Sequence, residues 1–311
     1  MSAPELARVA LAVNDVEQVV GVLTGVLGLP QREARTARGA RVPLVGVGRT
    51  VLAIAPCGGE LVADAERPGV HHIAIAAEDP SAAARAMGLA PAGATAVGLD
   101  DRLELELERG ATCGVRVRLC EPAPAPGWQR PTFAIDHIGV ASEDNARATE
   151  IFAGRLGAAV ESTQTDIEVS TAIESFTSDR YGVIYHSRPP RLVGGLRVSF
   201  LTVGDCELEF LAPIAAQEIA PGADAATPPG PGNTAGDKGA IARFIARSGP
   251  GLHHLALRTP DIAATLAALD AAGVELIDRE GRPGSRRALI GFVHPRAFGG
   301  VLVHLVERDE R

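Results

Sequence analysis

Four polar side chains in the second half of the chain stand at matching points of four strand-like segments: His137, Glu209, His254 and His304. Imidazole and carboxylate groups bind Fe, Mn, Co, Ni or Zn in sites that leave positions open for a substrate. A lone histidine is more often a hydrogen-bonded core or surface residue than a metal ligand. Four such side chains at matching points favour a site for one divalent metal ion.

The first half of the chain provides an internal comparison for this site. Its matching positions carry Arg8, Leu52, His72 and Arg118. This set cannot bind a metal ion, because it offers one imidazole beside two cations and an apolar side chain. We therefore expect a metal site in one half only, and we expect the function to reside in residues 131–308.

An internal repeat predicts the elements that position these residues. The four similar segments each run from an apolar strand into a helix cap, and they are RVALAVNDVEQV from Arg8, HHIAIAAEDPSA from His71, DHIGVASEDNAR from Asp136 and HHLALRTPDIAA from His253. Asp15 is expected to cap the first helix, and Thr259 or Asp261 the fourth. Short β-type runs follow each helix, so the repeated unit is βαβββ, present four times in an α+β fold.

The alternation of side chains along these strands separates the candidate ligands from the core. The apolar neighbours that are expected to face the core are Ile138, Leu208, Phe210, Leu255, Leu257, Val303 and Leu305, because successive side chains of a strand point to opposite faces. By the same alternation, His71 and His253 are expected on the face opposite the ligands, as structural residues. Glu207 shares the face of Glu209 and is its main rival as a ligand.

Length and composition limit the class of protein. The 311 residues are about two domains long. The formal net charge of -8 argues against nucleic acid or an anionic membrane as partner, because both reward a basic surface. The four cysteines are few and show no zinc-type spacing, so buried thiols in a reducing cytosol are expected. No segment has the roughly 18 consecutive apolar residues of a membrane span, and we expect a cytoplasmic protein.

The predicted domains follow from the repeat and from two segments of biased composition. Residues 1–122 form a degenerate domain without a metal site, residues 123–131 form a linker, and residues 132–311 form the metal-binding domain. Residues 220–239 are rich in Pro, Gly and Ala and predict a mobile loop or lid, although a plain linker is the more common meaning of such composition.

Several stretches of the second half resemble the vicinal oxygen chelate superfamily, which includes glyoxalases, bleomycin-resistance proteins, epimerases and extradiol dioxygenases. The matching stretches are DHIGVASED, VGDCELEFLAP, GLHHLALRTPDI and FVHPRAFGGVLVHLVER, and they are most similar to the methylmalonyl-CoA epimerase branch. The resemblance implies paired βαβββ modules that fold into tandem domains with curved sheets. It also implies a divalent metal, with His137, Glu209, His254 and His304 as ligands.

The chain departs from the epimerase pattern at two carboxylates. After GGVL an apolar residue and a glutamate are expected from the resemblance, but this chain has Val303 and His304. The catalytic glutamate upstream of VSFLTV is also missing, with Val193 or a neighbour in its place. Three neutral imidazoles and one carboxylate leave a divalent ion with a net charge of about +1, which makes it a stronger electrophile than two carboxylates would.

A general base and an anion-binding group are therefore sought elsewhere in the second half. The segment from Thr165 to Leu192 is rich in acidic and aromatic side chains, and its candidate bases are Glu168, Glu174 and Tyr185. Glu168 and Glu174 are expected to share a strand face toward the metal. Arg286 and Arg296 are candidates to grip a phosphate or carboxylate of the substrate, with solvated surface side chains as the alternative.

These features predict a metal-dependent epimerase or isomerase that removes a proton next to a metal-bound carbonyl of a small molecule. The substrate is expected to be an acyl-CoA thioester or a hydroxyketone such as a cyclitol, and the protein a monomer or homodimer. One alternative is a non-haem Fe(II) dioxygenase, although the dioxygenases of the family carry their carboxylate on the last strand. The other is a non-catalytic small-molecule binding protein.

Overall fold

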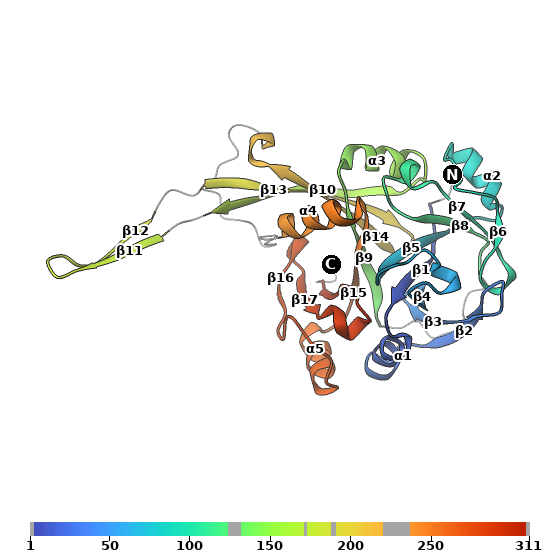
Figure 1. Ribbon diagram of the computed structural model, residues 1–311, viewed down its shortest axis with the longest axis horizontal. Helices are drawn as coiled ribbons and strands as arrows, with labels where there is room; N and C mark the ends of the chain where they lie inside the picture. The colour runs from blue at the N-terminus through green and yellow to red at the C-terminus, as the bar shows by residue number, and fades with distance from the viewer. Residues whose placement is uncertain (1–2, 124–131, 171–172, 188–190, 220–236, 309–311) are drawn as a thin grey trace.

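The computed structural model describes residues 3–123, 132–170, 173–187, 191–219 and 237–308 (Figure 1). Its first half contains the strands β1 (Leu6–Val13), β2 (Gln31–Arg35), β3 (Arg41–Val47), β4 (Thr50–Pro56), β5 (Gly69–Ala76), β6 (Ala96–Val97), β7 (Leu103–Glu106) and β8 (Val117–Cys120). They form one curled sheet in the order β2-β3-β4-β1-β5-β8-β7-β6.

The second half repeats this sheet. Its strands are β9 (Ala134–Ala141), β10 (Ala159–Ser170), β13 (Arg191–Val203), β14 (Cys206–Ala215), β15 (Gly251–Arg258), β16 (Arg282–Pro283), β17 (Leu289–Val293) and β18 (Val303–Glu307). The order β10-β13-β14-β9-β15-β18-β17-β16 matches the first sheet strand for strand. The predicted α+β fold of four βαβββ modules in two tandem vicinal oxygen chelate sheets is therefore confirmed.

Each module carries its helix after its first strand, and an aspartate begins each helix. The helices are α1 (Val16–Gly21), α2 (Pro80–Met87), α3 (Asn145–Gly154) and α5 (Ile262–Ala271). Their N-caps are Asp15, Asp79, Asp144 and Asp261, and each carboxylate accepts a hydrogen bond from the backbone N–H three residues later. Such caps satisfy a free donor of the first turn. The prediction of Asp15 is confirmed, and in the fourth module the cap is Asp261 rather than Thr259.

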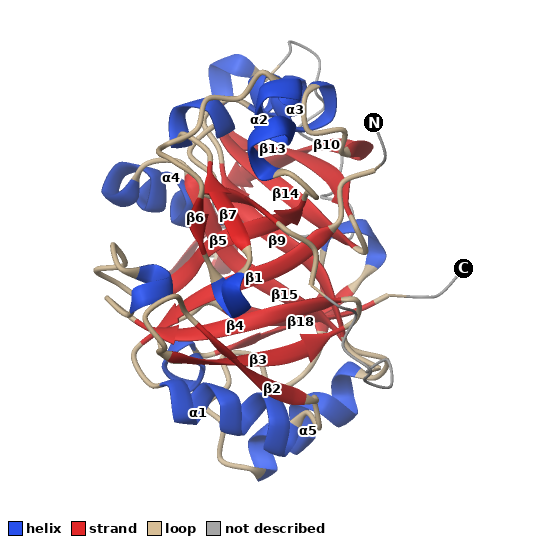
Figure 2. Cartoon of the chain, turned by 90° about the vertical axis from the view of Figure 1, so that its right-hand side faces the viewer, coloured by secondary structure: helices blue, strands red, loops and turns tan. Residues whose placement is uncertain are grey.

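One apolar core joins the two halves. All seven side chains that alternation placed in the core belong to a single buried cluster, which also contains Val9, Leu11 and Ile73 of the first sheet. The helices α1 and α5 lie together at one end of the molecule and α2 and α3 at the other (Figure 2). The halves also share backbone hydrogen bonds, such as Asn14 N to Gly299 O at 2.8 Å. The two sheets are thus packed as one body.

Two features of the second half were not in the predicted repeat. A separate two-stranded hairpin, β11 (Ile173–Ser178) and β12 (Gly182–Ser187), extends from the ends of β10 and β13 (Figure 1). A further helix, α4 (Asp237–Ser248), packs on β13, β14, β9 and β15. Residues 237–239 of the predicted loop are therefore helical, whereas residues 220–236, and residues 124–131 of the predicted linker, lie outside the described residues.

Candidate metal centre

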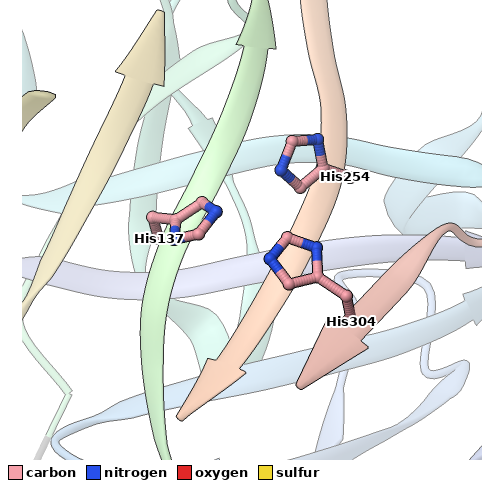
Figure 3. A group of neighbouring side chains, drawn as sticks. All are labelled: His137, His254 and His304. Carbon is pink, nitrogen blue, oxygen red and sulfur yellow. The ribbon is translucent and has the colours of Figure 1, made fainter. Parts of the chain in front are cut away.

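Four neighbouring strands of the second sheet each contribute one predicted ligand. Glu209 lies on β14, His137 on β9, His254 on β15 and His304 on β18, and these strands are adjacent in the order β14-β9-β15-β18. The three imidazoles converge on one another from their separate strands (Figure 3). The sheet thus brings together residues that are up to 167 positions apart, since 304 − 137 = 167.

The four side chains form a compact buried cluster. The ring centroids of His137, His254 and His304 are 5.0 to 5.5 Å apart, and one nitrogen of each ring lies within 4.8 Å of the others. Glu209 Oε2 is 3.4 Å from Nε2 of both His137 and His254. Each of the four residues is at most 7% exposed. Glu207, the rival ligand, instead forms an ion pair with Arg286.

Gly139 makes room for His254. It lies on β9 between Glu209 on one side and His254 on the other. A Cβ at this position would be 2.0 Å from Cε1 of His254, far inside van der Waals contact. A glycine within a strand often marks a close approach, and this signal in the motif DHIGV would have identified Gly139 from the sequence.

A β-bulge places His253 beside His254, and here the sequence prediction was wrong. The pairing of β15 with β9 shifts between Leu252 and His254, so that His253 is the extra residue. A bulge redirects side chains out of strict alternation. The Nδ1 atoms of His253 and His254 are 3.0 Å apart, and the His253 ring meets Phe244 of α4 edge to face at 4.8 Å. His253 is therefore in contact with a predicted ligand rather than on the opposite face.

Asp136 holds His137 from the other side of the cluster. Its Oδ1 is 2.7 Å from His137 Nδ1, and both of its oxygens accept hydrogen bonds from Arg308 at 2.6 Å. Although burial alone would raise the pKa of Asp136, the hydrogen bonds from Arg308 and His137 hold it far below its usual range. The carboxylate is thus ionised and directs Nε2 of His137 toward Glu209. Neither Asp136 nor Arg308 was predicted from the sequence as a site residue.

In the first half, the guanidinium group of Arg8 lies beside Nε2 of His72, the residue that matches His254. Arg8 forms a buried ion pair with Glu104 at 2.8 Å, and its Nη2 is 3.4 Å from Nε2 of His72. Arg118 pairs with Glu104 and Glu106. The prediction of Leu52 as the counterpart of Glu209 was wrong. Leu52 packs in the core shared by the two halves, whereas Ala53 clusters with Ala10 on the other face.

Comparisons with known proteins agree with this architecture. The family model described as Glyoxalase/Bleomycin resistance protein/Dioxygenase superfamily matches residues 136–292, which is half of the chain. The chain belongs to this superfamily. Across 99% of the chain and 94% of the other protein, its fold is similar to a triple mutant of 4-hydroxymandelate synthase from Streptomyces coelicolor, with a TM-score of 0.62 and 17% identity. That likeness concerns the fold alone.

Two curated relatives each match part of the chain. The chain is 30% identical to the uncharacterized protein YqjC of Bacillus subtilis over 112 residues, or 36% of this chain and 65% of the relative. It is 35% identical to the mitochondrial methylmalonyl-CoA epimerase of Dictyostelium discoideum over 74 residues, or 24% of this chain and 45% of the relative. The matches thus span less than two thirds of either relative.

The residues of this superfamily member fit a divalent metal ion. Among the described residues, Nε2 of His254 and Nδ1 of His304 are buried without a hydrogen-bond partner, which is costly unless another group satisfies them. Burial, together with the neighbouring His137 and His254, lowers the pKa of His304 well below its usual value, so its imidazole is neutral. Burial opposes ionisation of Glu209, but His137 and His254 outweigh it and lower the pKa of this carboxyl. Neutral imidazoles and an ionised carboxylate are the forms that bind metal.

The predicted bases lie away from this cluster. Glu168 pairs with Gly194, which is six residues along β13 from Phe200, the partner of Glu209. Six residues of a strand span roughly 20 Å. Glu174 and Tyr185 belong to the β11–β12 hairpin, where they pair with His186 and Ser175. Glu168 and Glu174 therefore lie in different sheets and do not share a strand face, because the chain leaves the main sheet between them.

Of the two predicted anion-binding arginines, only Arg286 lines a cavity beside the cluster. The open cavity has a volume of about 820 Å³, and Asp136, Glu161, Glu207, Arg258, Arg286 and Arg287 are among its lining residues. Arg286 lies 3.7 Å from the centre of the Phe200 ring and pairs with Glu161 at 2.8 Å and with Glu207. Arg296 is exposed on the turn Pro295–Phe298 and is not among the residues of this cavity.

Within the described part of the chain, no helix has the length and apolar character needed to cross a membrane.

Proposed function

We propose that the protein is a metal-dependent epimerase or isomerase that removes a proton from the carbon next to a carbonyl group of a small molecule. The observation that carries this proposal is the buried cluster of His137, Glu209, His254 and His304. A divalent ion held there supplies a Lewis acid that polarises a carbonyl oxygen and stabilises the negative charge left by the departing proton. Asp136 and Arg308 keep His137 oriented for this role.

We propose Glu207 as the group that takes the proton. It lies on β14 two residues before Glu209, on the same strand face, and pairs in register with His137. Its carboxylate is held by Arg286. A carboxylate beside the cluster is better placed to exchange a proton there than Glu168, which lies roughly 20 Å farther along the sheet.

Arg286 indicates that the substrate carries an anionic group. Its guanidinium group binds two carboxylates of the chain, Glu161 and Glu207, and an anionic substrate group can replace one of them. Within the described residues, the exposed Arg258 and Arg287 of the same cavity form no ion pair and add positive charge. A guanidinium group matches a carboxylate or phosphate through two parallel hydrogen bonds. We therefore propose a carboxylated or phosphorylated hydroxyketone or acyl thioester as substrate.

Exchange of substrate hydrogen with solvent deuterium tests the reaction type. The metal-loaded protein is incubated in D₂O with a panel of anionic hydroxyketones and acyl-CoA thioesters, and label next to the carbonyl is measured by mass spectrometry. We expect exchange with the wild type, loss of at least about 100-fold in Glu207→Gln, as is typical for removal of a general base, and little change in Glu168→Gln. Both variants should retain the metal. Absence of exchange with every compound refutes the proposal, and loss in Glu168→Gln alone would restore Glu168 as the base.

A non-haem iron dioxygenase is the second candidate. The observation that favours it is the position of Glu209 at 3.4 Å from both His137 and His254, because two histidines and one carboxylate form the iron site of many oxygenases. Substrate-dependent O₂ uptake by the Fe(II)-loaded protein, without deuterium exchange, would support this function. A protein that holds no metal and binds its ligand unchanged would instead be a binding protein.

A further inference from the structure

The contact between His253 and His254 restricts which nitrogen of His254 carries its proton. A neutral imidazole has one N–H donor and one lone-pair acceptor. The two Nδ1 atoms lie 3.0 Å apart in a partly buried position, so one ring must donate and the other accept. If His254 donates from Nδ1, its Nε2 keeps a lone pair toward Glu209 and His137. If His253 donates, Nε2 of His254 carries the proton instead.

The first half contains the same pair of histidines and shows which of the two donates the hydrogen bond. The pairing of β1 with β5 shifts so that His71 is the extra residue, and Nδ1 of His71 is 2.8 Å from Nδ1 of His72. Arg8 can only donate, so the contact with its Nη2 leaves Nε2 of His72 as the acceptor. Nδ1 of His72 therefore carries the proton and donates to His71. At the other end, Nε2 of His71 lies 2.9 Å from the carboxylate of Asp64, which accepts its proton.

In the first half, the equivalent pair of histidines thus already has a cation, Arg8, beside it. The guanidinium group of Arg8 faces Nε2 of His72 as a metal ion would face Nε2 of His254. The two halves share the bulge, the doublet of histidines and the Nδ1 contact, although only the second half has ligands for a metal. The Nδ1–Nδ1 contact therefore belongs to the fold of both halves. A cation beside Nε2 of the second histidine decides that this histidine donates the hydrogen bond from its Nδ1.

We propose that His253 is a positioning residue for the metal centre: it accepts a hydrogen bond from Nδ1 of His254 and thereby presents the Nε2 lone pair of His254 to the ion. This inference rests on the metal site of the proposed function. Partners of this kind fix the tautomer and ring orientation of a ligand, and their loss typically reduces metal affinity about 10- to 100-fold. Phe244 of α4 holds the accepting ring through its edge-to-face contact.

Metal affinity in matched variants tests the inference. The dissociation constant for Co²⁺ is measured by competition with a chromophoric chelator, together with the visible absorption spectrum of the bound ion. His253→Phe keeps a ring against Phe244 but removes the acceptor, and we expect affinity to fall about 10- to 100-fold with a changed spectrum. His253→Gln offers a carbonyl acceptor and should recover part of the loss. His71→Phe changes the equivalent bulge in the first half and should leave affinity and spectrum unchanged.

Each result has a distinct meaning. Tight binding by the wild type with equal affinity in His253→Phe overturns the inference and leaves the proposed metal site intact. An equal loss in His71→Phe also overturns it, because the effect would then belong to the bulge as a structural element. A wild type that binds no metal refutes the proposed function, and this inference with it. In the metal-loaded wild type, ¹⁵N chemical shifts of His254 must show the proton on Nδ1, a readout that does not depend on any variant folding well.

Discussion

Substitution of Gly139 by alanine should remove the metal site while leaving the fold in place. The added Cβ would lie 2.0 Å from Cε1, 2.2 Å from Nδ1 and 2.5 Å from Nε2 of His254. Ordinary contact begins at 3.4 Å, so the His254 ring must move by at least 1.4 Å, since 3.4 − 2.0 = 1.4. Metal ligands tolerate deviations of only about 0.2 Å from their bond length. His254 is therefore lost as a ligand.

The expected magnitudes follow from this displacement. Metal affinity should fall by at least about 100-fold, the upper range for disturbing even an indirect partner of the ion. The free energy of unfolding of the metal-free protein should fall by about 1–3 kcal/mol, the usual cost of overpacking a filled site. Affinity is measured by chelator competition and stability by urea denaturation without metal.

Gly154→Ala provides the matched control for Gly139→Ala. A Cβ at Gly154, the last residue of α3, meets nothing within 4 Å, so this variant should keep both its metal affinity and its stability. The equivalent strand of the first half already carries Ala10 opposite His72, which shows that the backbone accepts alanine there. Wild-type metal affinity in Gly139→Ala would refute the arrangement of ligands described above.

Two further predictions concern the first half. Glu104→Gln leaves the buried Arg8 without its carboxylate. It should lower the free energy of unfolding, measured by urea denaturation, by about 3–5 kcal/mol and leave metal affinity unchanged. A parallel loss of metal affinity would contradict the assignment of metal binding to the second half alone. Burial, followed by the charge of Arg116, lowers the pKa of His71 to about 4 from 6.5, so between these values the unfolded chain binds a proton that the folded chain does not. Stability should therefore fall as pH decreases from 6.5 to 4, by up to about 1.4 kcal/mol per pH unit for this residue. In urea titrations, the free energy of unfolding of His71→Gln should depend less steeply on pH than that of the wild type. An unchanged slope would show that His71 does not cause this pH dependence.

The sequence predicted the fold and the four adjacent strands that carry the candidate ligands because both depend on regular repeats. Two-residue alternation placed Leu208 and Leu255 in the core and Glu209 and His254 on the other face, and the structure agrees. Alternation fails where the strand is irregular. His253 was misplaced because the bulge adds one residue, which no local pattern of apolar residues revealed.

Other site residues depended on contacts that are distant in sequence. Arg308 is 172 positions from its partner Asp136 in the sequence, and no pattern in the last strand predicts this contact. The chain leaves the main sheet after β10 to form the hairpin, so acidic residues that are near in sequence, such as Glu168 and Glu174, are separated in space. Arg286 and Arg296 are ten positions apart, since 296 − 286 = 10. The strand β17 lies between them, so that only Arg286 lines the cavity.

The shared core has a consequence for how such a duplicated chain can change. Because one apolar cluster draws on both sheets, the first half cannot be removed without exposing the interior of the half that carries the candidate ligands. In that half, the Arg8–Glu104 ion pair is buried at the position that matches the candidate metal cluster. Substitutions in the first half are therefore limited by the packing of this core and by the buried Arg8–Glu104 pair, whether or not that half takes part in a reaction.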